Sequence, residues 1–360
     1  MKANILLLAL VAAPLACGPS PEPTTPEGLP PSQSETGAST APATTPATTP
    51  AETTPAKAAE PTPEEKKKAE AARELAEDRA KMEADTKAES ARWTPEVRAE
   101  AKKLAETKHA NLKAALNAAL KGKHRKPTSA ERDKYRHPVE TLEFFGLKPT
   151  MTVLEYGPGE GWYTELLAPT LATSGKLIVT TTDPAGPPDQ RATFYGERLK
   201  RFLDNGPEVY GKVERIVIDS KKPSFGLEGK VDVVLAFRTM HGMHRDKLLS
   251  TFLAEVHKAL KPNGVLAVEQ HRAKPDANPD ESAKAGYLPE AFVIQQVEAA
   301  GFKLAGKSEI NANPQDTKDY AEGVWALPPT FAMKDKDRQK YADIGESDRM
   351  TLKFTKVAKK

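Results

Sequence analysis

The sequence predicts an α/β protein with a doubly wound, mostly parallel seven-stranded sheet. Runs of β-branched and apolar residues recur from about 151 to 270, and segments with apolar residues at helical spacing separate them. A glycine-rich turn joins the first run to the helix after it. Strands that alternate with helices form βαβ units, and such units align their strands in parallel within one sheet.

The chain begins with a segment typical of an export signal. Residues 1–17, MKANILLLALVAAPLAC, contain a lysine, an apolar run too short to span a membrane, and small residues before Cys17. Ala16 followed directly by Cys17 resembles the bacterial lipoprotein signal, which implies acylation of that cysteine and a membrane anchor in the cell envelope or periplasm. Gly18 favours the outer membrane, because aspartate at that position marks retention at the inner one. Pro14 departs from the pattern, so ordinary secretion is the alternative.

Two segments of unusual composition follow. Residues 18–63 are rich in proline and threonine, contain no aromatic residue, and cannot bury enough apolar surface to fold, so we expect a disordered linker. Residues 64–93 are rich in Ala, Glu, Lys and Arg, with opposite charges four positions apart. This pattern predicts a solvated charged helix. The folded domain is expected over residues 94–360.

Composition excludes some classes of function. The 360 residues carry a net charge of +3, and 29% of them are charged, so the chain as a whole is not a polybasic nucleic-acid binder. A basic cluster at 121–126 lacks the interleaved aromatic residues of nucleic-acid sites, and we expect it to face water or anionic lipid. Cys17 is the only cysteine, which leaves no thiol for a disulfide, a metal or catalysis in the domain.

Elements of the domain can be placed in order. Thr94 and Pro95 form a helix start, and the helix is expected to reach residue 120. Strands are expected near 151–156, 176–181, 213–218, 231–237 and 264–270, and helices near 160–172, 188–204, 244–260 and 288–300. Two late strands, near 302–308 and 351–356, enclose a polar insertion at 309–350. A loop of that length is either functional or disordered.

The glycine turn is the most informative motif. Gly157, Gly159 and Gly161 lie at a strand-to-helix corner, where backbone without Cβ atoms lets a ligand approach the amides that open the helix. Dinucleotide sites read G-x-G-x-x-G, and the bulky Trp162 stands where their third glycine would fall, which argues against NAD and FAD. A simple tight turn is the alternative.

The stretch from Val153 to Gly161, with Glu155 two positions before the first glycine, resembles the first motif of class I S-adenosylmethionine (SAM) methyltransferases. The resemblance implies SAM as cofactor, with the glycine turn and Glu155 at its binding site. Ligands of such sheets bind at the carboxyl ends of the strands. Asp183, after the second strand, is therefore a candidate to bind the ribose hydroxyls, and Asp219, after the third, to bind the adenine amino group. Turn or helix caps are the alternative roles for both.

The fourth and fifth strands end in groups that can bind anions or move protons. Arg238 and His241 follow the fourth strand, and Glu269 and His271 end the fifth. His241 is the candidate general base and Arg238 a candidate anchor, with helix capping the alternative for His241. A His241/His244 metal pair lacks a third ligand at suitable spacing, so no metal is expected.

A wider resemblance covers about residues 127–357. It runs through Arg132 to Pro138, Phe144 to Gly146, Gly157 to Tyr163, Leu167 to Pro169, Phe237-Arg238 with His241, Ser308 to Pro314, Asp316 to Asp319, Gly323 to Trp325 and Gly345 to Met350. These motifs are similar to those of a group of bacterial methyltransferases known from their sequences. We expect the upstream helix and the insertion to form a lid over the sheet edge, with substrate or lid residues Asp133, Arg136, Trp162, Tyr163, Asn311 and Asn313.

The sequence thus predicts a lipid-anchored SAM-dependent methyltransferase. The Asn/Asp-Pro-Pro-aromatic motif of amino-directed methyltransferases is absent after the fourth strand, which favours a small acceptor with an oxygen, sulfur or carbon nucleophile. Nucleic acid is not expected as a partner, and the sequence leaves the oligomeric state open. Two alternatives remain. The domain either binds a SAM-like ligand without turnover, or serves as a structural envelope lipoprotein that retains the fold.

Overall fold

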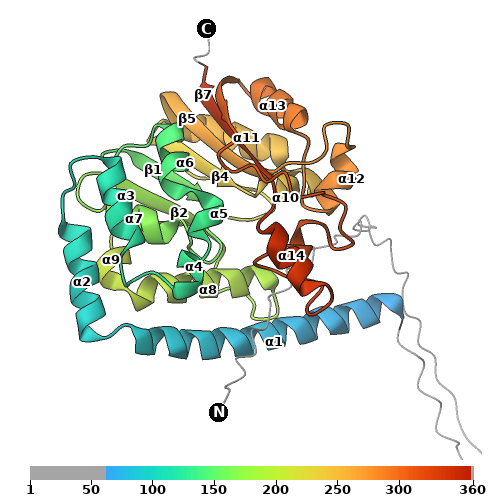
Figure 1. Ribbon diagram of the computed structural model, residues 1–360, viewed down its shortest axis with the longest axis horizontal. Coiled ribbons are helices and arrows are strands. Elements are labelled where there is room, and N and C mark those ends of the chain that lie inside the picture. Colours follow the sequence, from blue (N-terminus) through green and yellow to red (C-terminus); the bar gives the residue numbers. More distant parts are fainter. Residues whose placement is uncertain (1–61, 358–360) are drawn as a thin grey trace, which may run out of the picture. The chain divides into compact units, whose positions relative to one another are not determined.

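The computed structural model describes residues 62–357, and Figure 1 shows their arrangement. The predicted signal at 1–17, the lipidation site Cys17 and the linker up to residue 61 lie outside the described residues. From Ala71 onward the described chain belongs to one compact unit. None of the helices within residues 62–357 is both long and apolar enough to cross a membrane.

Seven strands form one sheet in the order β3-β2-β1-β4-β5-β7-β6. Strands β1 to β5 are parallel, whereas β7 is antiparallel to both β5 and β6. This confirms the predicted doubly wound, mostly parallel sheet. The strands are β1 (Thr152–Tyr156), β2 (Lys176–Thr181), β3 (Glu214–Val217), β4 (Val231–Phe237), β5 (Leu260–His271), β6 (Phe302–Ser308) and β7 (Arg349–Lys356).

Helices cover both faces of the sheet because successive strand residues point to opposite sides. Val153 of β1 lies in one buried core with α2, α3, α6 and α7, and the next residue, Leu154, lies in a second core with α11 and α13. The helices are α1 (Pro63–Arg92), α2 (Pro95–Glu106), α3 (Leu112–Leu120), α4 (Pro127–Ala130), α5 (Asp133–Arg136), α6 (Pro138–Phe145), α7 (Thr164–Leu171), α8 (Arg191–Asn205), α9 (Pro207–Tyr210), α10 (Met240–Arg245), α11 (Leu249–Ala259), α12 (Pro279–Lys284), α13 (Glu290–Ala299) and α14 (Arg338–Ile344).

Two predicted helices are each divided in the structure. The stretch 94–120 forms α2 and α3, and the side chain of Asn111 caps α3 by accepting from the amide of Ala114 at 2.9 Å. The stretch 244–260 belongs to α10 and α11, because Lys247 between them adopts a left-handed conformation (φ 59°) that no helix continues. Thr94 caps α2 as predicted, with its hydroxyl accepting from the amide of Val97.

Helix α1 differs from the solvated helix that the sequence predicts. Leu75 and Met82 are buried against Phe194 of α8, and Arg79 forms an ion pair with Glu197 of α8 at 2.7 Å. Figure 1 shows α1 running along α8. Two large apolar residues seven positions apart lie on one face of a helix, and this short stripe is enough to dock α1 on the domain.

The insertion at 309–350 is ordered and contains a 3-10 turn (Gly323–Ala326) and α14. Nδ2 of Asn311 donates to the hydroxyls of Thr141 in α6 and Thr351 in β7, both at 3.0 Å. Nδ2 of Asn313 donates to the carbonyls of Ile344 and Glu346. The two asparagines therefore hold the insertion together and join it to the upstream helices.

Candidate functional site

The glycine turn after β1 adopts the backbone that its sequence predicts. Gly157, Gly159 and Gly161 all have positive φ, at 61°, 62° and 84°. The amide of Gly157 donates to Oγ1 of Thr180 on β2 at 2.9 Å. A Cβ at Gly159 would meet nothing within 4 Å, whereas a Cβ at Gly161 would lie 2.3 Å from the ring of Phe202. A Cβ at Gly157 would make an ordinary contact with the side chain of Thr239 at 3.5 Å. Of the three glycines, Gly159 therefore leaves open space, and Gly161 permits close packing.

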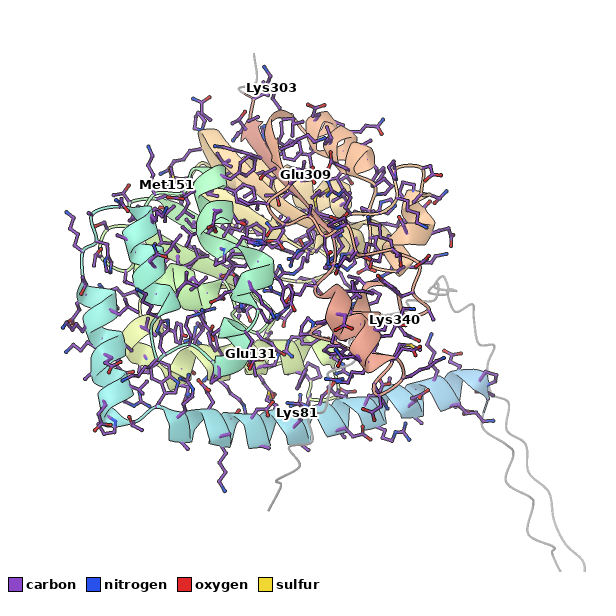
Figure 2. All side chains as sticks on the ribbon, viewed as in Figure 1. Lys81, Glu131, Met151, Lys303, Glu309 and Lys340 are labelled. Atoms are coloured by element: carbon purple, nitrogen blue, oxygen red, sulfur yellow. The ribbon has the colours of Figure 1, made fainter. Side chains whose placement is uncertain are left out.

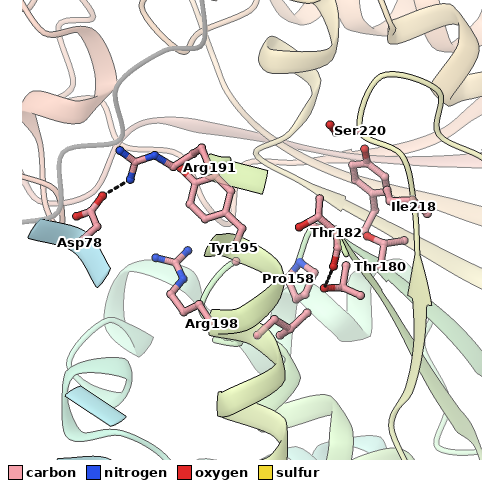
Figure 3. Close-up of a pocket in the computed structure, with 14 residues that line it drawn as sticks. Asp78, Pro158, Thr180, Thr182, Arg191, Tyr195, Arg198, Ile218 and Ser220 are labelled. Atoms are coloured by element: carbon pink, nitrogen blue, oxygen red, sulfur yellow. Dashed lines mark hydrogen bonds and ion pairs between the residues drawn. The ribbon is translucent and has the colours of Figure 1, made fainter. Parts of the chain in front are cut away.

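A cavity of about 340 Å³ lies beside this turn, at the carboxyl ends of β1, β2 and β3. This is the edge where open α/β sheets bind ligands, and the volume falls within the range of small-molecule sites. Figure 3 shows its residues as sticks. They are Asp78, Tyr156, Gly157, Pro158, Gly159, Thr180, Thr181, Thr182, Arg191, Tyr195, Arg198, Leu199, Ile218 and Ser220.

The remaining predicted cofactor residues lie outside the cavity lining. Glu155 is buried and accepts a hydrogen bond from Oγ1 of Thr164 at 2.7 Å, and burial raises its pKa to about 7. Asp183 and Asp219 are exposed. Each caps a turn, accepting from the amide of the residue two positions on, at 2.9 and 2.8 Å. The capping alternatives thus describe both aspartates, since a side chain fixed in a tight turn follows the turn rather than the strand.

Asp78 of α1 is a residue that sequence reasoning missed. It is the one acidic residue among those that line the cavity in the described part of the chain, and it forms an ion pair with Arg191 of α8 (Figure 3). The only available signal was its place between Leu75 and Met82, the two apolar residues of an otherwise charged helix. Arg191 and Arg198 were also missed, because basic residues on an amphipathic helix ordinarily face water.

The sequence predicts residues for acceptor binding at the ends of β4 and β5, which we call the acceptor rim: Arg238, His241, Glu269 and His271. Buried polar contacts join this rim to its neighbours. Oε1 of Glu269 accepts from Nη1 of Arg238 at 3.0 Å, and Oε2 accepts from the hydroxyl of Tyr163 at 2.9 Å. Arg349 approaches the same carboxylate at 3.4 Å. Burial alone would raise the pKa of Glu269, but Arg349 and Arg238 outweigh it and hold the pKa below its usual value.

A second buried carboxylate continues this network. Glu346 binds Arg132, Arg136 and Arg349 at 2.6, 3.2 and 2.8 Å. Although burial opposes its ionisation, the three guanidinium groups hold the pKa of Glu346 well below the usual range. Burial lowers the pKa of Arg136 to about 9. The contacts link α5, the end of the insertion and β7. They also leave these side chains engaged with one another.

The two histidines of the rim are neutral at pH 7. Burial lowers the pKa of His241 to about 4, and its Nδ1 lies 3.2 Å from Nε2 of Gln270. Burial also holds the pKa of His271 well below the usual value, and its Nδ1 lies 2.6 Å from the hydroxyl of Ser347. His241, His271 and Arg238 do not line the cavity beside the glycine turn.

The other predicted substrate or lid residues have structural partners. The carboxylate of Asp133 accepts two hydrogen bonds from the guanidinium of Arg125, at 2.7 and 2.8 Å. Trp162 is buried, donates from Nε1 to the carbonyl of Ser129 at 2.8 Å, and lies under the guanidinium of Arg136 at 4.6 Å. Arg125 is buried as well, so the basic cluster at 121–126 does not face water along its whole length. Part of the positive charge of this cluster is therefore buried inside the domain, where Arg125 pairs with Asp133.

Within residues 62–357 no group of three His, Cys, Asp or Glu side chains is placed to hold a metal ion. His244, the second member of the histidine pair, binds Oδ1 of Asp280 on α12 through Nε2 at 2.8 Å.

A family model described as "Methyltransferase domain" matches residues 129–305. With the observed sheet order, the match supports a class I SAM-dependent methyltransferase family. It also supports SAM as the cofactor of this domain. The matched residues include the glycine turn and β1 to β5, and they end inside β6. No curated protein matches the chain in sequence.

Solved structures resemble this domain at low identity. A SAM-dependent methyltransferase from Aquifex aeolicus is 19% identical, with a TM-score of 0.40, over 64% of this chain and 94% of that chain. A 1,6-didemethyltoxoflavin-N1-methyltransferase from Burkholderia thailandensis, solved with S-adenosylhomocysteine, is 16% identical, with a TM-score of 0.38, over 62% and 77%. A protein of Bordetella parapertussis described as a possible exported protein is 17% identical, with a TM-score of 0.38, over 66% and 71%.

Proposed function

We propose that the protein is a SAM-dependent methyltransferase acting on a small molecule. The observation that carries the proposal is the cavity of about 340 Å³, which borders the two positive-φ glycines at the ends of the first three parallel strands. SAM, when bound, supplies an electrophilic methyl group on a sulfonium. Methyl transfer depends mainly on an aligned, desolvated nucleophile, so few residues need to move protons.

The residues of the cavity fit such a ligand. Gly157 and Gly159 line the cavity without side chains and would hold the amino-acid end of the cofactor, and Tyr156 and Ile218 would offer apolar surface to its base. We assign the ribose hydroxyls to Asp78, in place of Asp183, because Asp78 brings a carboxylate to the cavity. A carboxylate is acceptor-only and suits a pair of hydroxyl donors. Arg191 of α8 already forms an ion pair with Asp78 and so places this carboxylate at the cavity.

The proposal extends to the location of the enzyme. The sequence of residues 1–17 supports export and acylation at Cys17, and the composition of residues 18–63 supports a linker between the membrane and the domain. Globomycin treatment, which blocks lipoprotein signal cleavage, together with mass spectrometry of the mature N-terminus tests this part. An unmodified N-terminus beyond Cys17 would establish secretion without a lipid.

A second candidate is a binding protein that retains the cavity without turnover. The observation in its favour is that Arg238, Glu269, Tyr163 and Arg349 are engaged with one another where the sequence places the acceptor. This candidate also removes the need for SAM, a cytoplasmic product, to be renewed outside the cytoplasm.

Calorimetric titration with SAM and S-adenosylhomocysteine tests the shared prediction of a nucleoside cavity. Release of S-adenosylhomocysteine over a panel of small acceptors then separates the two candidates. Binding with turnover supports the enzyme, and binding without turnover for every acceptor supports the binding protein. The absence of binding by either ligand would contradict both.

A further inference from the structure

A second cavity, of about 480 Å³, lies between α1, α8 and the start of α4, and it shares Arg198 with the first cavity. The glycine turn lies between the two, since Gly157 to Gly159 line the first and Glu160 lines the second. The second cavity is lined by Lys81, Met82, Asp85, Thr86, Ala88, Glu89, Arg92, Lys126, Pro127, Thr128, Glu160, Arg198, Arg201, Phe202 and Asn205. Figure 2 labels Lys81 on α1.

The lining favours an anion. Five basic and three acidic side chains surround the space. The acidic ones are engaged, because Glu89 binds Arg92, Asp85 binds Lys81, and Glu160 binds Arg198. The other two basic residues are Lys126 and Arg201. Arg201 pairs with Glu83, a carboxylate that does not line the cavity and is 64% exposed. An exposed pair of this kind is weak, so Arg201 can turn to a ligand at little cost.

Lys126 and Phe202 narrow the kind of anion that would suit this cavity. Nζ of Lys126 lies 5.2 Å from the centre of the Phe202 ring, so a cation and an aromatic face are presented together. Two buried donors nearby, Nε of Arg198 and Nδ2 of Asn205, have no hydrogen-bond partner within the described residues. Buried donors without partners are costly. Neither atom is exposed to the cavity, so a ligand would reach them only if these side chains turned.

We propose that this second cavity is the acceptor site, and that the acceptor is a small planar anion, such as an aromatic carboxylate, with a hydroxyl to be methylated. The inference rests on the proposed function, because it needs a methyl donor in the first cavity. In the reaction, the acceptor oxygen forms a bond to the methyl carbon while the sulfur–methyl bond breaks. That electron pair stays on sulfur, giving neutral S-adenosylhomocysteine, and the hydroxyl proton passes to water.

The assignment of the acceptor to the second cavity agrees with what the structure has at the ends of β4 and β5 and beneath α1. Buried ion pairs occupy the ends of β4 and β5, whereas α1 encloses the second cavity, which lies next to the first. Helix α1 then has a definite role. It supplies Asp78 to one cavity and Lys81 to the other, three residues apart and therefore on one helix face.

The test uses 3,4-dihydroxybenzoate as probe and its uncharged amide as the matched ligand, titrated into the full chain with S-adenosylhomocysteine present at saturation. We expect the carboxylate to bind and the amide to bind about tenfold more weakly. Lys126→Met should weaken carboxylate binding by about tenfold. Lys87→Met, an exposed residue of α1 outside the lining, should leave it unchanged. S-adenosylhomocysteine affinity should stay within about twofold in both variants.

The other outcomes overturn either the acceptor site or the proposed function. If S-adenosylhomocysteine binds but the carboxylate does not, or binds equally well to Lys126→Met, the acceptor site is wrong and the proposed function stands. If the carboxylate binds in a Lys126-dependent way but neither SAM nor S-adenosylhomocysteine binds, the proposed function is wrong, and the acceptor role falls with it.

Discussion

The carboxyl ends of β1 to β3 border a cavity of about 340 Å³, while the ends of β4 and β5, on the same edge of the sheet, are joined by buried ion pairs. The sequence placed chemistry-bearing residues at both. At the first, small residues and hydroxyls leave space. At the second, long charged side chains bind one another. The comparison teaches that a charged residue past a strand need not mark a ligand site, because buried partners can match its charge.

The largest effect should come from breaking the ion-pair network. Replacing Glu346 with Gln leaves Arg136 buried without its carboxylate and leaves Arg349 with Glu269 alone, which should reduce the free energy of unfolding by about 3–5 kcal/mol. Urea denaturation measures this. The matched control is Glu309→Gln, which removes an exposed partner of Arg272 and should cost less than about 1 kcal/mol. Equal, small losses in both variants would mean that the network does not stabilise the fold.

Glu155 provides a test through pH. Its pKa in the folded state is about 7, above the ordinary value of 4.5, because burial disfavours the carboxylate. The folded chain therefore holds this proton over a window in which the unfolded chain has lost it. The stabilisation is complete below pH 4.5 and is lost as pH rises through 7, by about 3 kcal/mol in total.

Glu155→Gln removes this titration. The difference in unfolding free energy between wild type and variant should therefore shift in favour of the variant from pH 5 to pH 8. Glu165 has a raised pKa as well, but it titrates in both proteins and cancels in the difference. A difference that does not change with pH would show that Glu155 is not desolvated as the structure has it.

Asp78 tests the cavity itself. Asp78→Asn should weaken S-adenosylhomocysteine binding by about tenfold, since it removes a charge-assisted acceptor from the lining. The control, Glu197→Gln, breaks another ion pair between α1 and α8 outside the cavity and should leave the affinity nearly unchanged. Similar losses in both variants would assign the effect to docking of α1 rather than to the ligand contact.

His241 should give the smallest effect. His241→Gln keeps a polar side chain beside Gln270, and with an acceptor in the second cavity we expect turnover within about threefold of wild type. Because the pKa of His241 is about 4, the imidazole is neutral from pH 5 to 8 and adds no pH dependence there. A loss of 100-fold or more would instead identify His241 as the general base that the sequence suggests.

The sequence predicted the sheet closely because strands carry local signals. β2 and β4 have the predicted bounds, and the late antiparallel strand begins two residues early, at Arg349. The glycine turn was also predictable, since positive φ is a local requirement. Asp183 and Asp219 each cap their own turn, and the position after a strand does not reveal whether a carboxylate turns to a ligand or caps its turn.

By itself the sequence determined the strand and helix alternation, the ligand turn and the class of fold, all of which follow from patterns within a few residues of each other. Only the tertiary structure decided which charges are free. Leu75 and Met82 dock α1 on α8 and bring Asp78 to a cavity more than 70 residues away along the chain. Glu346 neutralises the arginines of α5 from the far end of the insertion. Long-range pairing of this kind leaves no local pattern, because either partner alone looks like a solvated charge.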